Sequence, residues 1–134
     1  MGIVELLSAV VGGDDRATDA LVGLSPDDVV TAAGVHGVLP LIAERLAGTS
    51  AANTPVGVRV AEQARWQAAG DMLREMELRQ LLQALEAARI DALVIKGAQL
   101  AYSCYTRPDL RPRVDTDLLI AVADRARVAE VLHG

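Results

Sequence analysis

Two aspartates separated by one residue lie inside an otherwise apolar segment near the end of the chain. Asp115 and Asp117 fall within residues 111–120, where most of the other side chains are Val, Thr, Leu and Ile. Charge in a buried strand is costly unless it is paired or binds a metal ion. Successive side chains of a strand face opposite sides, so both carboxylates would project from one face. The spacing predicts oxygen ligands for a hard cation, Mg²⁺ or Mn²⁺, although solvated acids on an edge strand are the alternative.

A lysine–glycine pair upstream is the second feature that could do chemistry. Val94 and Ile95 favour a strand and the residues after Ala98 favour a short helix, so Lys96 and Gly97 lie where one becomes the other. Glycine lets the backbone approach a ligand closely and adopt angles that are closed to other residues, and the N–H groups that begin a helix favour an anion. We therefore expect this turn to bind phosphate, with an ordinary surface turn as the alternative.

Three arginines lie next to the acidic pair, in a loop that Pro108 and Pro112 stiffen. They are Arg107, Arg111 and Arg113. The planar guanidinium group binds phosphate through two parallel hydrogen bonds, so one or two of these side chains would contact a triphosphate or pair with the aspartates. The alternative is a solvated loop whose positive charge offsets the nearby acids.

Together these residues resemble the core motif of a bacterial group of uncharacterised nucleotidyltransferases in the polymerase-beta nucleotidyltransferase superfamily. The matching residues are Lys96-Gly97-Ala98, Tyr105, residues 108–112 and residues 115–119. Residues 36–46 also resemble a helical segment that precedes the catalytic domain in that group. The resemblance extends from about residue 28 to the end of the chain.

The resemblance implies transfer of a nucleotidyl or phosphoryl group from a nucleoside triphosphate to a hydroxyl group on a small molecule, peptide or protein. Asp115 and Asp117 would be the catalytic residues and would hold the Mg²⁺ or Mn²⁺ ion. Lys96, Gly97 and Arg111 would bind the nucleotide. Arg111 is the one arginine of the loop that matches the family pattern closely.

One element of the superfamily pattern is missing, because a third carboxylate usually comes from a later strand. Asp124 and Glu130 follow Asp117, but both fall in a predicted final helix. Enzyme activity therefore stays open, and a second hypothesis is a non-catalytic interaction module that binds a protein partner. A purely helical adaptor is a further alternative.

Composition excludes several classes of protein. The net charge of -5 argues against a broad basic surface for nucleic acid, and aromatic residues make up only 2% of the chain, which leaves little material for base stacking. The single cysteine, Cys104, excludes an internal disulfide. No apolar stretch is long enough to span a membrane, so we expect a cytoplasmic protein.

The elements that would position these residues predict an α+β fold. We expect a helical N-terminal platform over residues 1–90 and a partial nucleotidyltransferase core, with a mixed sheet and flanking helices, over residues 91–134. Caps, prolines and apolar spacing predict helices over 3–11, 16–22, 26–34, 38–47, 56–88 and 123–132. Ser25-Pro26 and Thr54-Pro55 are the clearest starts, and the longest helix could bend or break near Gly70. Two strands leave bare edges. We therefore expect an N-terminal portion of a longer protein, a homo-oligomer, or a partner chain that completes the sheet.

Overall fold

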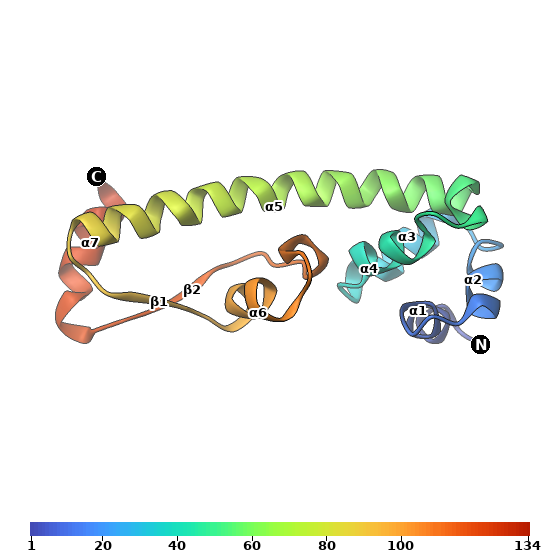
Figure 1. Ribbon diagram of the computed structural model, residues 1–134, viewed down its shortest axis with the longest axis horizontal. Helices are drawn as coiled ribbons and strands as arrows, with labels where there is room; N and C mark the ends of the chain where they lie inside the picture. The colour runs from blue at the N-terminus through green and yellow to red at the C-terminus, as the bar shows by residue number, and fades with distance from the viewer. The chain divides into compact units, whose positions relative to one another are not determined.

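The computed structural model describes residues 1–134, which divide into two compact units. The first unit comprises residues 1–69 and 109–112, and the second comprises residues 70–108 and 113–134. Both strands of the protein belong to the second unit, whereas the first is built from helices and turns (Figure 1). The α+β class is confirmed, and the two strands exclude the purely helical adaptor. The predicted boundary at residue 90 marks the change from helix to strand, while the two units divide within the longest helix.

The helices of the first unit form where the local sequence predicts them. They are α1 (Ile3–Val11), α2 (Asp15–Leu21), α3 (Pro26–Val35), α4 (Leu39–Leu46), the 3₁₀ turn η1 (Ser50–Asn53) and the beginning of α5 (Pro55–Ala87). Asp14 caps α2, because its Oδ1 accepts hydrogen bonds from the N–H groups of Arg16 and Ala17. Ser25, the predicted cap of α3, precedes that helix but makes no capping hydrogen bond through its side chain.

The core of the first unit consists of aliphatic side chains from these helices. The completely buried members larger than alanine are Leu21, Val29, Ile42, Val56 and Val60, which come from α2, α3, α4 and α5. Each fully buried side chain of this size contributes roughly 1.5–3 kcal/mol to folding. The stability of this unit therefore rests on apolar burial.

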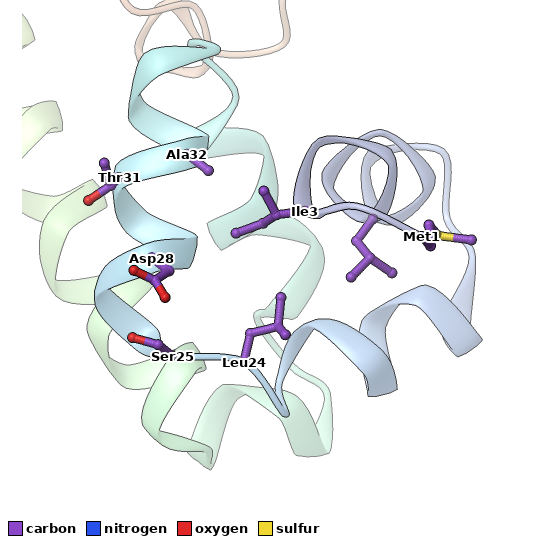
Figure 2. A pocket seen from close by; sticks show the side chains of 8 residues that line it. Met1, Ile3, Leu24, Ser25, Asp28, Thr31 and Ala32 are labelled. Atoms are coloured by element: carbon purple, nitrogen blue, oxygen red, sulfur yellow. The ribbon is translucent and has the colours of Figure 1, made fainter.

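A cavity of about 450 Å³ lies in the first unit beside α1 and α3 (Figure 2). Ile3 and Leu24 face this space, and Asp28 is the one charged side chain among those that line it. The full lining is Met1, Ile3, Leu6, Leu24, Ser25, Asp28, Thr31 and Ala32. A lining with no basic side chain does not suit a phosphate group.

Helix α5 runs without interruption from Pro55 to Ala87, so the helix does not break at Gly70. It ends through Arg89, whose backbone has a φ of 53°. The N–H group of Ile90 then donates to the carbonyl of Leu85. This is the left-handed helix ending that glycine usually forms. None of the helices combines the length and the apolar character that a membrane span requires.

The second unit holds a small antiparallel sheet and the helices next to it. Its elements after α5 are β1 (Ala92–Ile95), α6 (Lys96–Cys104), β2 (Asp117–Ile120), the turn η3 (Val122–Asp124) and α7 (Arg125–His133). The turn η2 (Pro108–Leu110) includes residues assigned to both units. The strands pair from Ala92 with Ile120 to Ile95 with Asp117, and α6 contacts both of them. The sheet of residues 1–134 thus has two antiparallel strands, where a mixed sheet was expected.

Candidate functional site

The junction of β1 and α6 brings Lys96 to Asp117. Ile95 pairs with Asp117 across the sheet, so Lys96 directly follows the residue opposite the aspartate. Lys96 Nζ lies 3.2 Å from Asp117 Oδ1, and the two side chains are 68% and 37% exposed. Solvent screens an ion pair of this exposure, which contributes at most about 1 kcal/mol. Both groups therefore stay accessible to a ligand.

Lys96 has a left-handed backbone, with a φ of 57°. We expected Gly97 to supply the unusual backbone angles of this turn, but Gly97 lies in the first turn of α6. A left-handed conformation costs a residue with a side chain roughly 1–2 kcal/mol, and such strain is frequent at functional sites. The first N–H groups of α6 have no partner within the helix, so they can bind an anion at this turn.

Asp115 does not lie in the strand, which corrects the expectation that one strand presents both carboxylates. Strand β2 begins at Asp117, because β1 ends at Ile95 and the chain then turns into α6 at Lys96. No residue of β1 is left to pair with Asp115. The aspartate is exposed in the short segment that precedes the strand.

Asp115 instead lines a cavity of about 290 Å³ that lies wholly within the second unit. One side of the cavity comes from α5 and the other from residues 114–116; the lining is Arg74, Glu77, Leu78, Leu81, Val114, Asp115 and Thr116. Arg74 and Glu77 were not predicted as site residues from the sequence. Charged residues three positions apart on a helix are typical of any solvated face, so no sequence signal separated them from the rest of α5.

Arg113 is a packing residue, although it belongs to the arginine group that was expected to meet phosphate. It is buried, its Nη2 donates to the hydroxyl of Tyr102 at 2.9 Å, and its guanidinium carbon lies 5.0 Å from the centre of that ring. Its Nη1 donates to the carbonyl of Pro108 at 3.5 Å. These contacts hold the segment before Asp115 against α6.

Arg111, the predicted nucleotide-binding arginine, belongs to the first compact unit with residues 109–112. Its side chain is half-buried, and its Nε is buried without a hydrogen-bond partner. A buried N–H group without a partner costs roughly 1–3 kcal/mol. The assignment of Arg111 to nucleotide binding stays a prediction.

The donor set at the aspartates fits a cation that arrives with phosphate. No group of three or more His, Cys, Asp and Glu side chains is placed to hold a metal ion by itself. Mg²⁺ is usually bound in such sites by one or two carboxylates together with substrate phosphates and water. Asp115 and Asp117 can supply those carboxylates, and a bound nucleotide would have to supply the remaining ligands.

Comparison with protein families identifies the chain. A family model described as uncharacterised nucleotidyltransferase matches residues 23–134, a range that includes the Lys96–Asp117 pair, Asp115 and the cavity beside it. No curated protein and no solved structure matches the chain. The family match spans most of the protein and agrees with the resemblance carried by Lys96-Gly97 and by the two aspartates. The chain therefore belongs to the uncharacterised nucleotidyltransferase family.

Proposed function

We propose that this protein binds a nucleoside triphosphate with Mg²⁺ or Mn²⁺ and transfers its nucleotidyl or phosphoryl group to the hydroxyl group of an acceptor. The observation that carries the proposal is the ion pair of Lys96 and Asp117, two residues of the family motif that lie 3.2 Å apart at the start of a helix. A basic side chain, free helix N–H groups and a carboxylate are the groups that a metal-bound triphosphate requires.

Lys96 has a different partner in the free protein and in the complex that we propose. In the free protein its ammonium group is next to Asp117. When a triphosphate binds, the ammonium group moves to a phosphate oxygen and releases the carboxylate. The N–H groups that begin α6, including that of Gly97, orient the phosphate, and Asp117 would then hold the cation together with Asp115. The cation, when bound, neutralises the charge that develops on the phosphate oxygens.

The transfer is a single displacement at phosphorus. The hydroxyl oxygen of the acceptor forms a bond to the attacked phosphorus, and the bond from that phosphorus to the leaving pyrophosphate or nucleoside diphosphate breaks. The leaving group takes the electron pair, and the hydroxyl proton passes through a carboxylate to water. Because little covalent chemistry falls to the protein, its main contributions are position and charge.

Calorimetric titration with ATP, GTP, CTP and UTP, each with and without Mg²⁺, tests the proposal. We expect binding that depends on the metal ion and that the Asp117→Asn variant loses. Asp91→Asn is the matched control, since Asp91 is exposed and precedes β1, whereas Lys96 follows the other end of that strand and pairs with Asp117. Binding that both variants retain, or that neither metal ion affects, would overturn the proposed site.

A non-catalytic interaction module is the second candidate. It is favoured by the apolar cavity beside α1 and α3 and by the sheet, whose two strands each pair on one side alone. Leu93 and Leu119 face each other across the ladder and are both exposed, so a protein partner or a second copy of the chain would find an apolar surface there. A folded sample that binds no nucleotide with either metal ion would favour this function.

A further inference from the structure

We propose that the cavity beside Asp115 is the acceptor site, and that its acceptor is a small alcohol with an apolar body and a protonated amine. The inference rests on the proposed function, because it assigns the second substrate of the same reaction. Four observations support it: the position of the cavity beside Asp115, its volume, its apolar side chains and the charged groups around it.

The cavity lies next to the proposed phosphate site along the chain. Thr116, which lines it, immediately precedes Asp117, the partner of Lys96. A molecule in the cavity would therefore contact Asp115 and would lie one residue along the chain from Asp117. The volume of about 290 Å³ is just below the range of roughly 300–1,000 Å³ that is usual for small-molecule sites. This size favours a small acceptor over a peptide or protein.

Each side of the cavity contributes apolar side chains. Leu78 and Leu81 contribute from α5, and Val114 contributes from the opposite segment. Leu78 is buried, while Val114 is 89% exposed. An exposed valine at the rim of a cavity gains from contact with an apolar ligand, because that contact removes both surfaces from water. The wall therefore selects a ligand with a hydrocarbon body.

The charge around the cavity favours a cation. Arg74 Nη1 lies 3.0 Å from Asp71 Oδ1, so the one basic side chain of the lining has a buried carboxylate beside it. Glu77 and Asp115 make no ion pair with another side chain. Two carboxylates without a basic partner attract an ammonium group and repel an acid. The amine of the acceptor would pair with Glu77.

The remaining polar groups suit the reacting hydroxyl. Asp115 can accept a hydrogen bond from that hydroxyl, and the Thr116 hydroxyl can donate one to its oxygen. When the acceptor oxygen forms its bond to phosphorus, the hydroxyl proton passes to water. The electron pair of the broken P–O bond leaves with pyrophosphate or the nucleoside diphosphate.

Three probes of one shape but different charge test the assignment. They are 2-amino-1-phenylethanol, 1-phenylethanol and mandelate, which share a phenyl ring and a hydroxyl group and are cationic, neutral and anionic at neutral pH. Ligand-observed NMR with the full chain, in the absence of nucleotide and metal ion, measures their binding. We expect the cationic probe to bind most tightly and mandelate most weakly. Equal binding of all three, or no binding of the cationic probe, would overturn the inference.

Two pairs of variants locate the binding. Val114→Trp should occupy the mouth of the cavity and abolish binding of the amine, whereas Val122→Trp changes a valine that is equally exposed in the same unit and lies outside the cavity. Glu77→Gln should weaken binding about two- to fivefold, as expected for one exposed charge. Glu86→Gln, on an exposed residue of α5 away from the cavity, should have no effect. Equal effects of both members of either pair would contradict the site.

The two proposals fail in different experiments. If the amine binds the chain but not Val114→Trp, and the chain binds no nucleotide, the cavity is a cation site. That result would overturn the proposed function and the acceptor role that rests on it. Metal-dependent nucleotide binding in a chain that does not bind the amine would support the proposed function and overturn only the acceptor assignment. Adventitious binding alone would persist in Val114→Trp and would also overturn that assignment.

Discussion

Lys96 and Asp117 are 21 positions apart in the chain, and their side chains form an ion pair at the point where β1 turns into α6. Because both groups are accessible, we expect Lys96→Met to fold normally and to lose most of its affinity for nucleotide. A charged hydrogen bond to phosphate is worth about 1.5–3 kcal/mol, which corresponds to at least a tenfold rise in Kd. Calorimetry and a thermal melt measure the two effects. An unchanged Kd would remove Lys96 from the phosphate site.

The backbone of Lys96 gives a second expectation, about stability. Lys96→Gly and Lys96→Ala both remove the ion pair, but only glycine adopts a φ of 57° without strain. We therefore expect the glycine variant to be about 1 kcal/mol more stable than the alanine variant. Urea unfolding of the two proteins measures the difference. Equal midpoints would show that the left-handed turn is not strained.

Arg89 ends α5 with a φ of 53°, in the position where helices usually place glycine. Arg89→Gly should raise the free energy of unfolding by about 1 kcal/mol, because glycine has no Cβ to oppose that conformation. Arg89→Ala is the control and should bring no such gain. A glycine variant that melts no higher than the alanine variant would contradict the interpretation.

Replacing two glycines of α5 with alanine should change the stability of the protein in opposite directions. A Cβ at Gly57 would clash with the carbonyl oxygen of Ala51, so Gly57→Ala must displace the backbone of η1. At Gly70 the nearest atom is Arg74 Nη1, at 3.5 Å, which is an ordinary contact. Gly70→Ala should therefore stabilise the helix by about 0.5–1 kcal/mol, whereas Gly57→Ala should destabilise the protein. Thermal melts of both variants check the two signs.

The contact of Arg113 with Tyr102 should also stabilise the protein. Tyr102→Phe keeps the ring beside the guanidinium group but removes the hydroxyl that accepts a hydrogen bond from Nη2. Since Arg113 is buried, the loss should cost roughly 1.5–3 kcal/mol. Tyr105→Phe is the matched control, because the hydrogen bond and the ring contact of Arg113 both go to Tyr102. Denaturant unfolding that fails to separate the two variants would refute the role of this contact.

The helices were predictable because their signals are local. Thr54 Oγ1 accepts a hydrogen bond from the N–H group of Gly57, as the Thr-Pro start of α5 predicts, and the glutamate–arginine pair of Glu75 and Arg79 forms one turn apart. The Glu75 carboxylate raises the pKa of Arg79 through a hydrogen bond and through its charge. Neighbours within one helical turn are enough to produce all of these features.

Long-range pairing explains why the candidate site was only partly predictable. The composition and spacing of Lys96-Gly97 and the aspartates were sufficient to indicate a family and its chemistry, because those properties are local to the motif. The length of β2 depends on where β1 ends. Asp115 therefore lies outside the strand, and only Asp117 forms an ion pair with Lys96. The cavity that joins Asp115 to Glu77, far away in the chain, exists only because α5 packs beside that segment. Contacts of this kind depend on folding, and no periodicity within either segment encodes them.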